Sequence, residues 1–444
     1  MFITAIISTA ILLDQSVQTD TSDAETDTKG GARSAPEMWS NYTSRGDYVS
    51  ALISQTVPDE IPAAATPHYL RYKNTQVYNF TGRYTHAHRL AAPNFFTPPS
   101  GLDLGEAGWV TPSELTNYTR TDALDYLRTA IADRNIVIIN EAHQMGHHRA
   151  FMAELLPVLK EAGFTHFGME ALSPEAEHVW QTTGTPTGGS GYYFSDPMMG
   201  HVLSVADQQG FDWFAYEIRA EQRIDCAVQE CTPETRIANR EQAQAQNIHE
   251  RVFVDNPNAR VALYVGFSHL DEGHDGNTWM AARLAELSGF DPLTIDQVTG
   301  SGIAPAETAA LVQSIHDGFA ITEPSILVSD AGTPLAPPTS RWDADITLFL
   351  PAALNSDPEA RPEWLAAIPG RQPVDIDVSS LEERPLVVQA FSTPRAERAA
   401  PVDQLSILEG EDVSSIQLFL PAGHYEIQVQ TPSGIIDLPE RDLD

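Results

Sequence analysis

One carboxylate and three histidines follow a predicted buried strand at close spacing. The apolar run Ile136–Ile139 predicts the strand, and Glu141, His143, His147 and His148 come directly after it. A carboxylate can orient and polarise an imidazole, which then acts as a general base on a water molecule or a substrate hydroxyl. The alternative is a polar helix start, where Glu141 would suit the helix dipole. Adjacent helical residues point about 100° apart, so we expect one of His147 and His148 at most to face the site and the other to be solvated.

Three later apolar runs also end on an acid or a histidine, at Glu170, Glu217 and His269. An acid at a buried strand end needs a partner, and either burial or a nearby cation shifts its pKa. Arg219 is the partner expected for Glu217, in a catalytic role or in a structural salt bridge. His274 follows in an acidic loop that we expect to be exposed. Ligands bind outside the carboxyl ends of the strands in α/β sheets, so these four strand ends predict one shared site.

These residue types suit hydrolysis, with His143 as general base and with Glu141 and Glu170 orienting it. His269 would stabilise an oxyanion or bind a metal. Carboxylate and imidazole ligands suit Zn, Mn or Fe, and Glu141, His143 and His269 are the ligands that we predict if a metal is bound. Contacts to the substrate are expected from His147, His148, Glu217, Arg219 and His274.

Strands alternate with helices from about residue 110 onward. This alternation predicts crossover connections and a mainly parallel sheet covered by helices, in an α/β domain over residues 110–371. An open doubly wound sheet and a barrel are both compatible with it. The expected strands are 136–139, 165–169, 212–216, 260–265, 291–295 and 346–350, and the expected helices are 121–134, 147–162, 197–209, 233–254 and 277–288.

The two ends of the chain have different compositions. Residues 372–444 contain short alternating strands and predict a small antiparallel β-module. Residues 20–109 are expected to be a disordered linker and a lead-in, in which the period-two segment 76–84 could be a strand. Residues 1–19 resemble a signal peptide, because the apolar run there is too short to span a bilayer.

Two cysteines and an acidic surface limit the compartment and the partners. Cys226 and Cys231 could close a small loop in an oxidising compartment, so we expect a periplasmic or extracellular protein, with the cytoplasm as the alternative. The chain has 61 acids against 26 basic residues and a net charge of −35. Such a charge disfavours nucleic acid and anionic membranes as partners and is typical of proteins in salty surroundings. A small-molecule substrate or haem is the expected partner, and no integral membrane segment is expected.

Known nucleotide-binding and serine-hydrolase motifs are missing. The sequence has no Walker P-loop, no Gly-x-Gly-x-x-Gly after a strand, no His-Glu-x-x-His and no Gly-x-Ser-x-Gly elbow. The strand-end residues therefore have to be interpreted on their own.

Several ordered motifs resemble the erythromycin esterase-like and ChaN-like superfamily, to which the TIKI/TraB proteins are distantly related. They are Glu141-x-His143, Gly-Phe-x-x-x-Gly-Met-Glu170-Ala, the run from Arg240 to Asn247-Ile, and Gly-Phe-Ser-His269. The resemblance covers residues 120–300 and extends toward 350. It implies lactone opening by a histidine-activated water in the esterase branch, haem binding by exported lipoproteins in the ChaN branch, and metal-dependent peptide cleavage in the TIKI branch.

The sequence departs from this pattern at three points. The spacing Glu-x-His is that of the ChaN-like branch, Asn140 stands where a glycine usually precedes the glutamate, and no cysteine near residue 20 could carry a lipid. The leading expectation is a hydrolase of an ester or related bond. The alternatives are a ChaN-like protein that binds haem or metal through His143, His147 or His148, and an accessory protein with a vestigial cleft.

Overall fold

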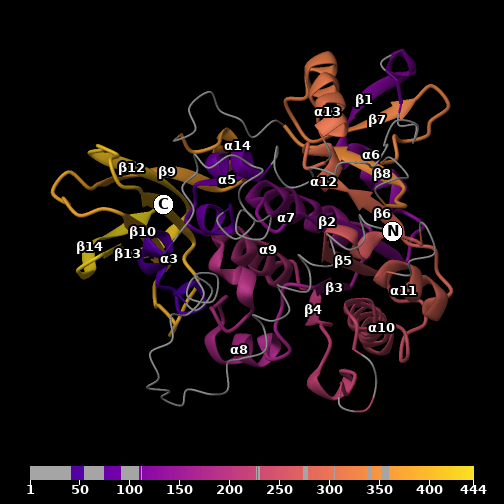
Figure 1. Ribbon diagram of the computed structural model, residues 1–444, viewed down its shortest axis with the longest axis horizontal. Helices are drawn as coiled ribbons and strands as arrows, with labels where there is room; N and C mark the ends of the chain where they lie inside the picture. The colour runs from indigo at the N-terminus through magenta and orange to yellow at the C-terminus, as the bar shows by residue number, and fades with distance from the viewer. Residues whose placement is uncertain are drawn as a thin grey trace. The chain divides into compact units, whose positions relative to one another are not determined.

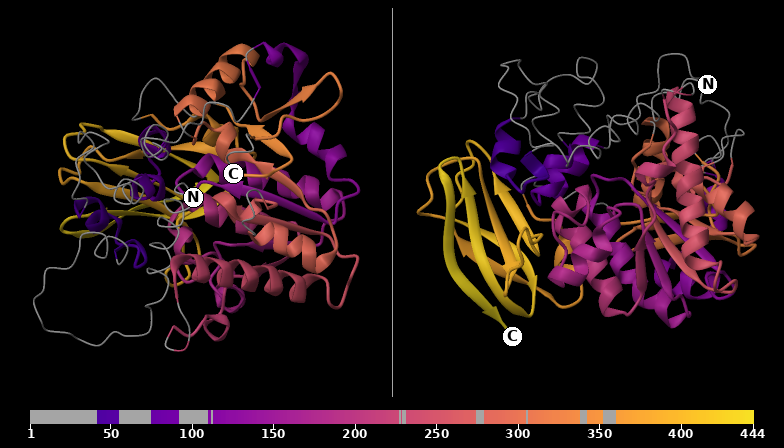
Figure 2. Two further views of the ribbon diagram at one scale, coloured as in Figure 1. Left: turned by 45° about the vertical axis from the view of Figure 1, so that its right-hand side comes forward. Right: turned by 90° about the horizontal axis from the view of Figure 1, so that it is seen from below.

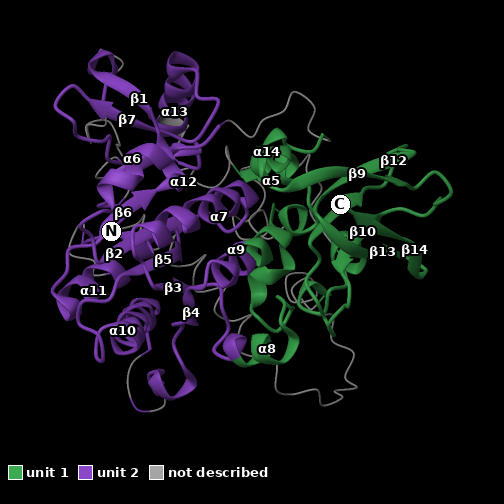
Figure 3. Ribbon diagram, turned by 180° about the vertical axis from the view of Figure 1, so that it is seen from behind, with its two compact units in different colours: residues 1–94, 178–201, 354–444 green, residues 95–177, 202–353 purple. Residues whose placement is uncertain are grey.

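The protein is described by a computed structural model that covers residues 42–54, 75–91, 110–111, 113–226, 228, 231–273, 279–304, 306–337, 342–351 and 360–444. The expected signal peptide and disordered linker lie outside these residues. The chain divides into two compact units (Figure 3), one made of residues 95–177 and 202–353 and the other of residues 1–94, 178–201 and 354–444. No helix in the part that the structure describes is long and apolar enough to cross a membrane.

The unit of residues 95–177 and 202–353, which is unit 2 in Figure 3, contains an eight-stranded, mostly parallel sheet, which confirms the α/β prediction. Its order is β1-β7-β8-β6-β2-β5-β3-β4, with two free ends, so the sheet is open (Figure 1). β1 and β7 pair antiparallel at one edge, and the other strands run parallel. The strands are β1 Tyr118–Asp122, β2 Ile136–Glu141, β3 His166–Met169, β4 Asp212–Ala215, β5 Val261–Gly266, β6 Leu293–Asp296, β7 Ser325–Ser329 and β8 Ile346–Phe349.

Helices connect the parallel strands and cover both faces of the sheet. α7 lies on one face of the sheet and α10 and α11 lie on the other, with the strands between them in Figure 2. This is the arrangement that right-handed crossovers give for this strand order. Every residue of β2 and β5 is buried, as expected for strands covered on both faces. The helices of this unit are α6 Ala123–Ala130, α7 Gly146–Glu161, α10 Pro233–Val252, α11 Met280–Ser288, α12 Gln297–Gly300 and α13 Ala306–Phe319. Of the two helices between β3 and β4, α8 Ala176–Thr183 belongs mostly to the other unit, and α9 Pro197–Gln208 is divided between the two.

The register of the central strands brings their carboxyl ends level. Glu141 at the end of β2 is the Cα partner of Gly266 at the end of β5, and Met169 on β3 is paired with both Tyr264 on β5 and Ala215 on β4. Residues that follow each of these strands therefore emerge along one edge of the sheet.

The other unit, which is unit 1 in Figure 3, holds the antiparallel sheets that the C-terminal pattern predicts. One sheet has the order β11-β10-β13-β14, the other pairs β12 with β9, and their apolar side chains form one core. The segment 76–84 is not a strand, because residues 75–80 are helical. The other elements of this unit are α3 Tyr48–Ile53, α5 Tyr84–Ala91, α14 Glu363–Ala367, β9 Arg371–Asp377, β10 Leu386–Ser392, β11 Asp403–Ile407, β12 Ser415–Pro421, β13 Gly423–Thr431 and β14 Gly434–Leu443.

Candidate active site

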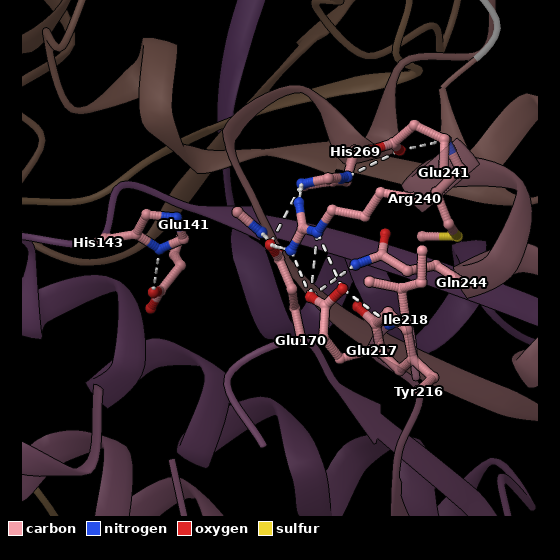
Figure 4. A network of polar contacts seen from close by, with 12 residues as sticks. Glu141, His143, Glu170, Tyr216, Glu217, Ile218, Arg240, Glu241, Gln244 and His269 are labelled. Atoms are coloured by element: carbon pink, nitrogen blue, oxygen red, sulfur yellow. Dashed lines mark hydrogen bonds and ion pairs between the residues drawn. The ribbon is translucent and has the colours of Figure 1, made fainter. Parts of the chain in front are cut away.

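His143 is held in one orientation by a buried carboxylate at the end of β2. Its Nδ1 lies 2.9 Å from Glu141 Oε1 (Figure 4), and the Glu141 side chain is 3% exposed. Arg149, on the first turns of α7, donates to both oxygens of Glu141 at 2.8 and 2.9 Å and to the carbonyl oxygen of His143 at 2.8 Å. Burial alone would raise the pKa of Glu141, but Arg149 and then His143 lower it to about 2. The carboxylate is therefore ionised and accepts a hydrogen bond from the N–H at Nδ1 of His143. In this tautomer the lone pair that can take up a proton is on Nε2.

Gly266 lets His143 and Glu170 approach each other. A β-carbon at this position would overlap Cε1 of His143 and would lie 2.6 Å from its Nε2 and 3.1 Å from Oε2 of Glu170. The backbone N–H of Gly266 also donates to Oε2 of Glu170 at 2.5 Å. The glycine thus fixes the second carboxylate and at the same time leaves room for the imidazole.

Arg240, on α10, connects two of the strand-end acids. Its Nη2 donates to Oε1 of Glu170 at 2.6 Å, and its Nε donates to Oε1 of Glu217 at 2.9 Å. Gln244, one turn further along α10, donates to Oε2 of Glu217 at 3.1 Å. Burial alone would lower the pKa of Arg240, but Glu217 and Glu170 raise it well above the usual value. Figure 4 shows the guanidinium among these acids and His269.

His269 lies between two carboxylates. Its Nδ1 is 2.8 Å from Oε2 of Glu241, and its Nε2 is 3.2 Å from Oε1 of Glu170. Burial alone would lower the pKa of His269, but Glu170 and Glu241 raise it to about 10. The raised pKa favours the imidazolium, which donates to Glu241 from Nδ1 and to Glu170 from Nε2. Nη1 of Arg240, 3.0 Å from the same Nε2, then approaches it without a hydrogen bond, because both groups are donors. The pKa of Glu170 is held well below its usual value despite burial, by His269 and Arg240.

The structure brings together the four residues to which the sequence assigned catalysis. His143, Glu141, Glu170 and His269 all lie at the carboxyl ends of β2, β3 and β5, as the aligned strand register requires. Glu217, at the end of β4, joins them through Arg240. One shared site at this edge of the sheet is the arrangement that the strand ends predicted.

Arg219 was the wrong partner for Glu217. Arg219 donates to Oδ1 of Asn247 at 2.7 Å, whereas Arg240 makes the ion pair with Glu217. Asn247 also donates to the carbonyl oxygens of Tyr216 and Glu217, so it holds the chain that leaves β4. Arg219 therefore helps to hold the loop after β4 through Asn247.

The expectation that one of the adjacent histidines is solvated was also wrong. His147 is 6% exposed and His148 is fully buried. Nδ1 of His148 accepts from the backbone N–H of Ala142 at 3.0 Å, and Nε2 lies 2.9 Å from the hydroxyl of Ser301. Nδ1 of His148 thus holds the turn between β2 and α7, and Nε2 ties α7 to the end of α12. His274 lies outside the described residues.

Three charged residues of the site were not singled out from the sequence. Arg149 lies eight residues after Glu141, and Arg240 and Glu241 are neighbours on α10. Arg240 begins the segment that resembles the superfamily helix, which was the available signal. Arg149 gave a weaker one, as a basic residue directly before the apolar stretch of the helix.

The predicted metal ligands do not fit a metal ion in this arrangement. Both oxygens of Glu141 are bound by Arg149 and His143, and His269 carries protons on both nitrogens between two acids. Among the described residues, no three His, Cys, Asp or Glu side chains are placed to hold a metal ion together.

The predicted loop disulfide is present. Cys226 and Cys231 form a disulfide in the segment between β4 and α10.

Comparisons with known proteins give no family for this chain. No family model matches it, and no curated protein matches it. Among solved structures, the type III effector HopBA1 is similar at 18% identity with a TM-score of 0.28, over 42% of this chain and 87% of the effector. RRSP, a MARTX toxin effector domain from Vibrio vulnificus, is similar at 17% identity with a TM-score of 0.30, over 66% of this chain and 62% of that one. The C-terminal region of Pasteurella multocida toxin is similar at 8% identity with a TM-score of 0.31, over 96% of this chain and 63% of that one. These scores are too low to carry an argument about function.

Proposed function

We propose that this protein is a hydrolase of the erythromycin esterase-like and ChaN-like superfamily that cleaves an ester or related bond of a small molecule. The observation that carries the proposal is the hydrogen bond between Nδ1 of His143 and the ionised, buried carboxylate of Glu141. It fixes the tautomer in which Nε2 accepts a proton, close to Glu170, which is itself paired with Arg240 and His269.

The reaction follows from this arrangement. Nε2 of His143 takes a proton from a water molecule, and the resulting hydroxide attacks the carbonyl carbon of the ester. The tetrahedral intermediate carries an oxyanion. When it collapses, the carbon–oxygen bond to the leaving alcohol breaks, and the imidazolium of His143 returns the proton to that oxygen. Glu141 stabilises the imidazolium while it exists.

Arg240 and His269 supply positive charge for the oxyanion. Nη1 of Arg240 lies 3.0 Å from Nε2 of His269, so the two cations are neighbours at the same strand end as Glu170. Glu170, Glu217 and Glu241 hold them in place before substrate arrives. Such preorganised charge stabilises a transition state without reorganisation during the reaction.

An exported location fits this proposal. The Cys226–Cys231 disulfide is the type of bond that persists in oxidising compartments.

Replacement of the proposed base tests the function. We expect His143→Ala to lower kcat/KM by about 10²–10⁴-fold on a panel of lactones and chromogenic esters, the range for loss of a general base. His178→Ala, at an exposed position on α8, is the matched control and should leave turnover unchanged. Equal turnover by wild type and His143→Ala on every hydrolysed substrate would show that His143 is not the base.

A further inference from the structure

A second buried polar cluster lies at the ends of β6 and β8. Asp296 ends β6 and is fully buried. Its Oδ1 accepts from the backbone N–H groups of Val298 and Thr299 at 3.0 and 3.2 Å and from Nδ2 of Asn140 at 3.0 Å. One carboxylate oxygen thus accounts for all of its hydrogen bonds.

The other oxygen, Oδ2, has no hydrogen-bond partner. The hydroxyl oxygens of Thr299 and Thr347 are likewise buried without a partner. Asp296 makes no ion pair with any Lys, Arg or His of the described residues. This cluster therefore combines one carboxylate and two hydroxyls, all of them fully buried.

These three side chains belong to one patch. Asp296 and Thr347 are Cα partners on parallel strands, so their side chains leave the sheet on the same face. The short helix α12 presses onto β8, because a β-carbon on Gly300 would overlap the carbonyl oxygen of Leu348. Thr299 precedes Gly300 and so lies over the same part of β8.

A buried carboxylate with no cationic neighbour has a high cost. An ionised group removed from water costs several kcal/mol unless it is paired or coordinates a metal. Protonation would not solve the problem, because it would bury a hydroxyl donor on Oδ2 with no acceptor. Both the ionised and the protonated carboxyl of Asp296 therefore need a further atom or ion next to Oδ2.

We propose that a monovalent cation, Na⁺ or K⁺, binds between Asp296 Oδ2 and the hydroxyl oxygens of Thr299 and Thr347. Alkali cations are hard ions that take oxygen ligands, as calcium and magnesium do. A single carboxylate balances one positive charge, whereas a divalent ion would leave an excess buried charge. The acidic composition fits a protein that works where such cations are abundant.

The cation site is connected to the candidate active site by Asn140. Nδ2 of Asn140 donates both to Asp296 and to the carbonyl oxygen of Phe267 at 3.0 Å. The ring of Phe267 meets that of His143 edge to face, with 5.1 Å between their centroids. A cation on Asp296 therefore stabilises the turn that positions His143.

Thermal unfolding of the full chain in different chloride salts at equal ionic strength tests this proposal. Tetramethylammonium chloride screens surface charge but is too large for the site. We expect Tm in NaCl or KCl to exceed Tm in tetramethylammonium chloride by about 2 °C or more. Asp296→Asn should lose this difference, because the neutral amide carries no charge for a cation to balance.

Two threonine variants keep the test decisive if Asp296→Asn does not fold. Thr347→Val removes the hydroxyl ligand and should lose the difference in Tm, whereas Thr347→Ser retains the ligand and should keep it. An equal wild-type Tm in all three salts, as expected if water fills the site, overturns the proposal. So does a difference in Tm that persists unchanged in Thr347→Val.

Discussion

The imidazole of His143 lies directly against the backbone of Gly266, so that a β-carbon on Gly266 would occupy the position of the ring. Gly266 is also the Cα partner of Glu141, the residue that orients the same imidazole. Two adjacent parallel strands thus define the position of the proposed base, one through a carboxylate and the other through the absence of a side chain.

Gly266→Ala should therefore displace His143. The backbone of Gly266 does not have a positive φ, so alanine is tolerated by the backbone; the ring of His143 has to move, and Glu170 Oε2 has to shift slightly. We expect a fall in kcat/KM of at least about tenfold, since misplacement of a catalytic group by about 1 Å costs up to 10²-fold. Circular dichroism should show a folded protein.

Gly318→Ala is the matched control for this change. Gly318 lies in α13 with no atom within 4 Å of its added β-carbon, and alanine favours a helix over glycine by about 1 kcal/mol. This variant should keep full activity. If Gly266→Ala were as active as Gly318→Ala, the tight packing of His143 on β5 would not matter for turnover.

Arg149 should stabilise the fold mainly because Glu141 is buried. Arg149→Met leaves the carboxylate without its cation, and we expect the free energy of unfolding to fall by about 3–5 kcal/mol. Glu141→Gln with Arg149→Met removes both charges and should recover part of this loss. Urea unfolding of the wild type, both single variants and the double variant measures the coupling. A loss below about 1 kcal/mol in Arg149→Met would contradict the buried ion pair.

The apolar runs were sufficient to predict most of the parallel strands, because a strand that is covered on both faces consists almost entirely of apolar residues. β2 and β5 are of this kind. β1 could not be predicted in this way, since Tyr118–Asp122 is polar and only partly buried. It is a strand because β7 pairs with it along five residues, and that partner lies about two hundred residues away in sequence.

The acids of the site could be predicted and their partners could not. Strand ends are visible in the sequence, and the register of a parallel sheet aligns them, which places Glu141, Glu170 and His269 together. Arg149 and Arg240 reach the same edge from helices. Which face of a helix meets a strand end depends on packing at long range, so sequence proximity favoured Arg219 over Arg240 for Glu217.

Loss of the proton from His269 should make the protein less stable at alkaline pH. The folded pKa of about 10 lies above the ordinary value of 6.5, so the stabilisation is complete below pH 6.5 and is lost as the pH rises toward 10. Over this window we expect a fall of about 1.4 kcal/mol for each pH unit. Urea unfolding between pH 6 and 10 measures the slope. His269→Asn should flatten it, and His424→Asn, at an exposed position on β13, should not. A slope that His269→Asn leaves unchanged would mean that His269 is not the group that titrates.

Asn140 replaces the glycine that the resembled superfamily usually has before its glutamate, and its side chain ties β2 to the chain after β5 and to α12. It donates to the carbonyl oxygen of Phe267 and to Asp296, and it accepts from the backbone N–H of Gln297 at 3.0 Å. Asn140→Ala removes three buried hydrogen bonds, each worth about 0.5–1.5 kcal/mol, and releases Phe267 from its place beside His143. We expect lower stability and, at a temperature where the protein stays folded, lower kcat/KM. Asn135→Ala, at the other end of β2, removes only contacts to the chain before β5 and should leave kcat/KM unchanged. If Asn140→Ala lowered stability but turned over substrate at the wild-type rate, the contact of Phe267 with His143 would have no part in positioning the base.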